Sequence, residues 1–166
     1  MFKQIRSIIV LPFTVTVVIP ALLWFTVTSP EVNWKIWPLL IAIPLGITGL
    51  FFLIWTITLF IKIGKGTLAP WNPTQKLIIT GPYAYVRNPM LSGVFMILLA
   101  EAIAAQSGAI LTWFVLFVII NAIYFVLSEE PGLRKRFGRE YDEYCRNVPR
   151  YLPRRHPWIP DDQPDP

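Results

Sequence analysis

The sequence predicts an all-α integral membrane protein with about four transmembrane helices and a C-terminal amphipathic helix at the membrane surface. Three observations predict this class. Apolar residues make up 54% of the 166-residue chain and charged residues only 15%. The charges are clustered and leave long uncharged stretches, and almost all basic residues lie on one side of these stretches. We therefore expect residues 1–166 to form a single membrane domain.

Residues 1–63 are expected to contribute two spans. No charged residue occurs from Ser7 to Pro30 or from Ile36 to Ile61, which are stretches of 24 and 26 residues. A helix that crosses the hydrocarbon core needs about 20 predominantly apolar residues, so each stretch provides one span. The first stretch is too long for the apolar part of a signal peptide and no clear cleavage site follows it, so we expect it to be retained.

Residues 90–128 are expected to form a helical hairpin. Glu101 is the only charged residue from Asn88 to Ser128, and these 41 residues are too many for one span. The sequence Gln106-Ser107-Gly108 divides them into an incoming helix at about 90–105 and an outgoing helix at about 110–127. Glu101 lies about one turn from the outer end of the incoming helix, so we expect its carboxylate to reach water.

Residues 64–89 are expected to form a cytosolic loop, and 129–166 an amphipathic helix with a tail. The loop is rich in Gly and Pro, and we expect it to cover a site as a lid, with Gly64, Gly66 and Gly81 as hinges. From Pro131 to about Arg146, aromatic residues recur at helical spacing among basic ones. This pattern predicts a helix that lies at the interface after a bend at Pro131, followed by an extended, partly mobile tail.

The placement of Lys and Arg predicts the orientation. Of the fifteen basic residues, only Lys35 lies between the first two spans, and all the others fall on the opposite side. By the positive-inside rule that side is cytoplasmic, which predicts a multi-pass protein of the cytoplasmic membrane with both termini in the cytosol. The net charge of +5 is then explained by the membrane orientation and by attraction to anionic lipids, and we expect no nucleic-acid partner.

Charged residues at the cytosolic ends of the hairpin are the candidate functional site. Arg87 precedes the incoming helix and Glu129-Glu130 follow the outgoing one, so the hairpin brings them together. A guanidinium can hold the carboxylate of a zwitterion while a Glu holds its cationic group. Adjacent helical residues point about 100° apart, so at most one Glu faces such a pocket. Aromatic residues could form its wall: Trp71, Tyr83, Tyr85 and Phe137.

A structural explanation of the same residues stays open. Arg at a membrane boundary commonly reaches lipid phosphates. Glu130 and Arg134 are four residues apart, which is also the spacing of an ordinary surface pair on a helix.

Separated blocks of sequence carry a resemblance to a known family. They are Gly81-Pro82-Tyr83-Ala84-Tyr85-Val86-Arg87-Asn88-Pro89-Met90, then Glu129-Glu130-Pro131-x-Leu133, then Phe137-Gly138-x-Glu140-Tyr141-x-x-Tyr144. In this order and spacing they resemble the isoprenylcysteine carboxyl methyltransferase and phospholipid methyltransferase superfamily. The likeness covers about residues 64–153.

The resemblance implies an S-adenosylmethionine-dependent methyltransferase whose acceptor, a prenylcysteine-type carboxylate or a lipid, enters from the bilayer. It implies catalytic roles for Arg87 and Glu130 and no metal. The cofactor-binding residues that it implies are Gly81, Tyr83, Arg87, Asn88, Pro89, Gly93, Glu129 and Glu130.

This sequence departs from the family's usual Arg-His-Pro-x-Tyr-x-Gly motif at two positions. Asn88 stands in place of the His, and Leu91 in place of the Tyr. Asn can donate and accept hydrogen bonds but cannot act as an imidazole base, so the departures bear most on the identity of the substrate.

Two other functions remain open from the sequence. One is an NADPH-dependent membrane reductase, because sterol reductases have a similar C-terminal helical architecture and end in basic, tyrosine-containing segments. The other is a non-catalytic membrane protein of the same fold.

Overall fold

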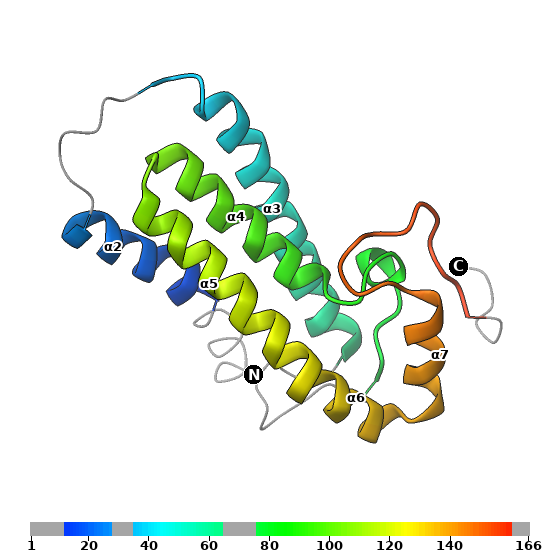
Figure 1. Ribbon diagram of the computed structural model, residues 1–166. Coiled ribbons are helices and arrows are strands. Elements are labelled where there is room, and N and C mark those ends of the chain that lie inside the picture. Colours follow the sequence, from blue (N-terminus) through cyan, green and yellow to red (C-terminus); the bar gives the residue numbers. More distant parts are fainter. Residues whose placement is uncertain (1–11, 28–34, 65–75, 161–166) are drawn as a thin grey trace.

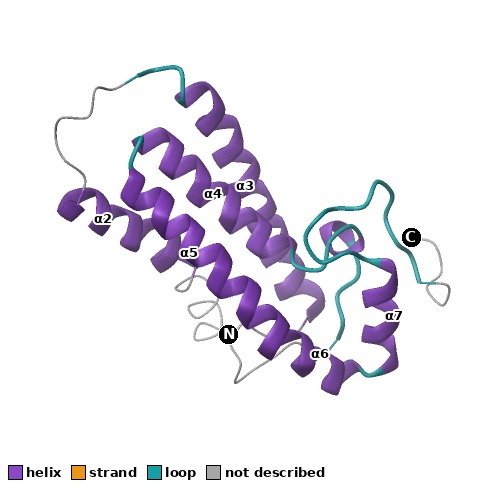
Figure 2. Cartoon of the chain, in the orientation of Figure 1, coloured by secondary structure: helices purple, strands orange, loops and turns teal. Residues whose placement is uncertain are grey.

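A computed structural model describes residues 12–27, 35–64 and 76–160, and within these ranges all regular structure is helical (Figures 1 and 2). Three of the helices continue through π turns: Thr14–Val18 leads into α2, Phe60–Gly64 extends α3, and Phe125–Glu129 joins α5 to α6. The α-helices are α2 (Ile19–Val27), α3 (Leu39–Leu59), α4 (Pro89–Ala105), α5 (Gly108–Tyr124), α6 (Glu130–Phe137) and α7 (Arg139–Asn147), with a 3₁₀ turn at Gly81–Ala84.

Two of the described helices are long and apolar enough to cross a membrane. They are Leu39–Ile63, with 25 residues, and Gly108–Phe137, with 30. Thr14–Val27 and Pro89–Ala105 are also apolar but shorter. The prediction of an all-helical fold is thus confirmed for the described residues, while the count of four spans stays a prediction.

The outer faces of the two long helices carry large apolar side chains. On α3, Leu40, Ile47 and Ile54 are exposed, and on α5 so are Ile119 and Ile123. Soluble monomers rarely leave such continuous apolar surface uncovered, so these faces fit contact with lipid chains.

Helix α4 packs between α3 and α5, and its contact with α3 depends on two glycines (Figure 1). A Cβ atom on Gly93 would lie 2.9 Å from the carbonyl oxygen of Gly49, and one on Gly49 would lie 2.8 Å from that of Gly93. The backbones of α3 and α4 therefore touch. Around this contact lies the main apolar core, which consists of Leu53, Met90, Val94, Leu98 and Phe117.

The predicted helical hairpin is confirmed. The incoming helix ends at Ala105, and Gln106 takes a left-handed conformation with φ of 49° before the outgoing helix begins at Gly108. The Gln106 side chain donates a hydrogen bond to the carbonyl oxygen of Lys35 at 2.9 Å. The turn of the hairpin therefore lies beside the start of α3.

The predicted bend at Pro131 is wrong. Helix α5 continues through the π turn and α6 as far as Phe137, and the chain changes direction only at Gly138, where φ is 54° (Figure 1). Pro131 lies in the first turn of α6, where a proline is tolerated, and the preceding π turn widens the helix before the ring. The predicted single amphipathic helix is consequently two helices, α6 and α7.

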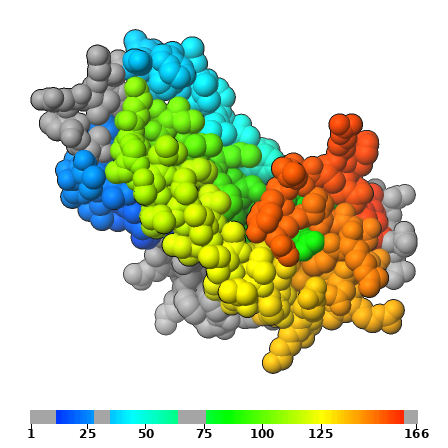
Figure 3. Space-filling model, viewed as in Figure 1, coloured from blue at the N-terminus to red at the C-terminus, as the bar shows by residue number. Residues whose placement is uncertain are grey.

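The residues after α7 form neither helix nor strand and make several bends, and they are bound to the rest of the protein. The backbone N–H groups of Arg154 and Trp158 donate to the carbonyl oxygens of Tyr85 and Ala84 at 3.1 and 3.0 Å. The Arg87 N–H donates to the Pro149 oxygen at 3.1 Å. We call residues 148–158 the C-terminal strap; together with α7 it surrounds part of the segment before α4 (Figure 3).

We predict that Gly93→Ala lowers the stability of the protein. The added methyl group would meet the backbone of α3, which cannot move aside as a flexible side chain can, and such overpacking costs about 1–3 kcal/mol. Thermal unfolding in detergent measures the effect. The control is Gly132→Ala, because nothing lies within 4 Å of the added Cβ there. Equal unfolding temperatures for both variants would contradict the close contact of α3 with α4.

Candidate functional site

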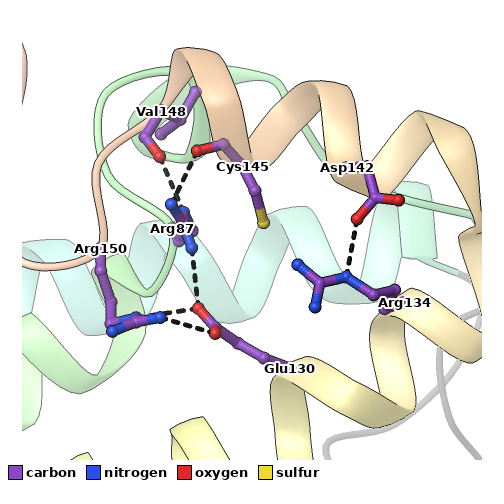
Figure 4. A network of polar contacts seen from close by, with 7 residues as sticks. All are labelled: Arg87, Glu130, Arg134, Asp142, Cys145, Val148 and Arg150. Atoms are coloured by element: carbon purple, nitrogen blue, oxygen red, sulfur yellow. Dashed lines mark hydrogen bonds and ion pairs between the residues drawn. The ribbon is translucent and has the colours of Figure 1, made fainter.

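Arg87 and Glu130 meet in space, as their positions at the two ends of the hairpin predict. Arg87 Nη1 lies 2.8 Å from Glu130 Oε1, and the two side chains are only 14% and 10% exposed. Arg150, from the C-terminal strap, binds the same carboxylate with two hydrogen bonds (Figure 4). Its Nε lies 2.9 Å from Oε1 and its Nη2 2.7 Å from Oε2. We call these three residues the ion cluster.

Arg87 also binds the end of α7. Its Nε donates to the Val148 carbonyl oxygen and its Nη2 to that of Cys145, both at 2.7 Å. The last carbonyl groups of a helix have no partner within the helix, and a cation placed there is favourable. All three nitrogen atoms of the Arg87 guanidinium are therefore engaged within the protein.

Both carboxylate oxygens of Glu130 are engaged in this arrangement. Its two carboxylate oxygens accept three hydrogen bonds from two guanidinium groups. A carboxylate that is largely removed from water requires such partners, since burial of an unpaired charge is costly. Glu130 is thus not available to bind a ligand cation or to accept a proton from a substrate while the ion cluster is intact.

Glu129 takes no part in the ion cluster. It is half-buried, and among the described residues no hydrogen bond or ion pair involves it. It lies close enough to Tyr83 to act on that residue electrostatically: burial raises the pKa of Tyr83 well above its ordinary value, and the charges of Tyr144 and Glu129 raise it further. Of the two glutamates, Glu129 is therefore the one that keeps a free carboxylate.

Several residues of the sequence-predicted site have packing roles. Gly81 has φ of 62°, and a Cβ there would lie 3.1 Å from Leu59 and 3.3 Å from Trp55, so the glycine lets the 3₁₀ turn rest on the end of α3. Tyr83 is buried, and its carbonyl oxygen accepts a hydrogen bond from the Tyr144 hydroxyl at 2.7 Å. Gly93 forms the contact with α3.

Asn88 and Pro89 begin α4. The Asn88 side-chain oxygen accepts a hydrogen bond from the Leu91 N–H at 3.2 Å, which makes Asn88 the N-cap of the helix. Pro89 is buried at the first helical position, where its missing N–H has no cost.

A small cleft opens between α4, α5 and the C-terminal strap, beside the ion cluster. Its cavity volume is about 20 Å³, which is room for about one water molecule, and the rest of the cleft is open to solvent. We call it the α4–α5 cleft. The residues that line it are Asn88, Leu91, Ser92, Phe95, Asn121, Ala122, Phe125, Arg150 and Tyr151.

The lining combines apolar walls with a few polar groups of complementary kinds. The Asn88 oxygen is engaged as the N-cap, which leaves its NH₂ group as a donor. The Asn121 NH₂ group donates to the Phe117 carbonyl oxygen at 2.8 Å, which leaves its oxygen as an acceptor. Leu91, Phe95 and Phe125 are apolar. A donor, an acceptor and a guanidinium between aromatic side chains suit a ligand with both polar and apolar parts.

Arg150 and Asn121 are absent from the site predicted by sequence. The sequence does contain a feature that could have identified Asn121. It is the only carboxamide in the apolar stretch 110–127, and polar residues in membrane helices often have functional roles. No such feature identifies Arg150, because three further arginines lie near it in the C-terminal segment and nothing in the sequence distinguishes it from them.

The predicted lid is described only in part. Trp71 and Gly66, with the rest of 65–75, lie outside the described residues. Residues 76–80 form neither helix nor strand, as predicted, although Ile78 and Ile79 are buried. The remainder, from Gly81 to Arg87, is held by α3 and the C-terminal strap, and the hinge role of Gly81 stays a prediction.

Comparison with known proteins gives one match. The family model for phospholipid methyltransferase matches residues 37–140. This range includes the helices α3 to α6 and the residues Arg87, Asn88, Glu129 and Glu130. Neither a curated protein nor a solved structure matches the chain.

We predict that Glu130→Gln destabilises the protein by about 3 kcal/mol, the lower end of the range for breaking a buried ion pair, because Arg150 is 35% exposed. The neutral amide leaves two guanidinium groups facing each other without a counter-charge. Thermal unfolding and proteolysis of the C-terminal strap measure the change.

The matched control is Asp142→Asn. This variant removes the ion pair between Asp142 and Arg134. The two side chains are 44% and 59% exposed, and ion pairs so exposed contribute little to the stability of a protein. If Glu130→Gln unfolds at the temperature of this control, the ion cluster does not hold the C-terminal segment.

Proposed function

This chain belongs to the phospholipid methyltransferase family, and from this premise we propose that it transfers a methyl group from S-adenosylmethionine to a lipophilic acceptor at the cytosolic face of a membrane. The observation that carries the proposal is the position of the α4–α5 cleft. It opens at Asn88, within the sequence block that resembles the family's cofactor motif, and lies beside the ion cluster.

The groups that line the cleft fit the amino-acid end of this cofactor. That end carries a carboxylate and an ammonium group, and the cleft offers a guanidinium, an amide donor and an amide acceptor. The cofactor supplies an activated methyl group on a sulfonium. The protein's contribution is to align donor and acceptor and to exclude water from the small, largely apolar space between them.

The sequence-predicted catalytic residues receive different roles in this proposal. Arg87 and Glu130 position α7 and the C-terminal strap, because all their polar groups are engaged with each other, with Arg150 and with backbone carbonyls. Glu129 keeps a free carboxylate and is the candidate for binding a cation or for accepting a proton.

The acceptor is proposed to be a prenylcysteine-type carboxylate or a lipid. A carboxylate acceptor needs no base, only orientation and removal of water, whereas an amine acceptor must lose a proton, for which Glu129 is the available group. Leu91, Phe95 and Phe125 give the cleft an apolar wall next to the exposed apolar face of α5. A hydrophobic tail can therefore leave the cleft toward the bilayer.

We predict that S-adenosylhomocysteine raises the unfolding temperature of the protein in detergent and that NADPH does not. A ligand that binds only the folded state stabilises it by about 2.7 kcal/mol at one hundred times its dissociation constant. Stabilisation by NADPH alone would favour the reductase hypothesis, and stabilisation by neither would favour a non-catalytic protein. Transfer of labelled methyl groups from S-adenosylmethionine to total membrane lipid or to a prenylated cysteine then identifies the acceptor class.

We also propose that four helices cross the membrane and that both termini are cytosolic. The support is the basic-residue asymmetry together with the lengths of the two longest helices.

We predict that a cysteine at Ile36 reacts with a membrane-impermeant thiol reagent from outside intact cells, and that one at Glu143 reacts only after lysis. Both side chains are exposed, and neither change removes a basic residue. A Cys145→Ser background removes the natural thiol. The opposite pattern of labelling would invert the topology.

A further inference from the structure

We propose that Arg150, held in orientation by Glu130, binds the carboxylate of the cofactor's amino-acid end in the α4–α5 cleft. This inference rests on the proposed function and names a residue that the resemblance does not assign. The resemblance points to Arg87 as the guanidinium for that carboxylate, but the structure places a different arginine at the cleft.

Arg87 is poorly placed for a ligand. Its side chain is 14% exposed, and its three guanidinium nitrogens are bonded to Glu130, Cys145 and Val148. It is not among the residues that line the cleft. To reach a ligand, Arg87 would have to give up the end of α7.

Arg150 is well placed. It lines the cleft, and its side chain is 35% exposed. Its Nε and Nη2 atoms bind Glu130, whereas no described residue accepts a hydrogen bond from its Nη1 atom. A guanidinium that binds one carboxylate through the Nε and Nη2 edge keeps N–H groups on its other edge for a second anion.

The charges around the cleft favour an anion at this position. The ion cluster holds two guanidinium groups and one carboxylate, and no carboxylate is among the lining residues of the cleft. A carboxylate on the ligand would balance the remaining positive charge. Because Glu130 already fixes the plane of the Arg150 guanidinium, little side-chain freedom is lost on binding.

The two carboxamides of the cleft complete the arrangement. The free NH₂ group of Asn88 is a second donor for the same carboxylate, and the free oxygen of Asn121 is an acceptor for the neighbouring ammonium group. The cleft therefore contains partners for both charged groups of an amino acid.

The test compares two ligands that differ only in the carboxylate: S-adenosylhomocysteine and its decarboxylated analogue, which keeps the adenosine, the thioether and the amine. Affinities are measured by calorimetry in detergent for the unaltered protein, Arg150→Gln and Arg154→Gln. Arg154 is a matched control, since it lies on the same strap and donates to the Asn147 carbonyl oxygen but does not line the cleft.

We expect Arg150→Gln to lose about ten- to a hundredfold of its affinity for S-adenosylhomocysteine and to bind the analogue as before, because a hydrogen bond to a charged group is worth one to two decades. Arg154→Gln should keep the preference of the unaltered protein. Arg150→Lys keeps the charge but cannot bind two carboxylates through two edges of a guanidinium, so its preference for S-adenosylhomocysteine over the analogue should be intermediate. If Arg150→Gln does not fold, this variant is used for the test instead.

Three outcomes would count against the idea in different ways. An equal loss for both ligands in Arg150→Gln would mean that Arg150 acts only by holding the strap. Equal affinity of the unaltered protein for both ligands would mean that the carboxylate is not recognised. Binding of neither ligand would overturn the proposed function itself, and this inference with it.

Discussion

The ion cluster of Arg87, Glu130 and Arg150 is the interaction on which the arrangement of the C-terminal half depends. It joins the start of α4, the start of α6 and the C-terminal strap, and through Arg87 it also holds the end of α7. Arg87 and Glu130 are little exposed to water and keep their charges only because each has a partner. Loss of one member would therefore affect four segments at once, and two of them, the start of α4 and the C-terminal strap, line the α4–α5 cleft.

The helices beneath the cluster give it a fixed base. Gly49 and Gly93 let α3 and α4 approach until their backbones touch, and the hairpin turn at Gln106 lies against the start of α3. The position of Asn88 and Arg87, just before α4, is thus set by close packing rather than by the loop that precedes them. A site that must align two reacting molecules benefits from such a base, because small displacements are costly in rate.

The sequence was sufficient to predict the features that follow from local patterns. Charge-free lengths and the break at Gln106-Ser107-Gly108 predict the hairpin, and the hairpin predicts that Arg87 and Glu130 meet. The bend was misplaced because Pro131 attracts attention as a helix breaker, whereas it is tolerated in a first turn and Gly138 adopts the positive φ that ends the helix. Arg150 could not be found, since its role depends on a tertiary contact of an irregular segment that has no periodicity of its own.

Asn88 shows how one residue can serve the fold and restrict the chemistry together. Its oxygen is used to cap α4, so only its NH₂ group can face a ligand, and an amide cannot take a proton at neutral pH. Both oxygens of Glu130 are bound by arginines, which leaves Glu129 as the carboxylate of the pair that is available as a base. Glu129 is not among the residues that line the α4–α5 cleft. If the cleft holds the reacting groups, the arrangement therefore favours an acceptor that is already deprotonated when it arrives, because orientation and desolvation are then sufficient for methyl transfer.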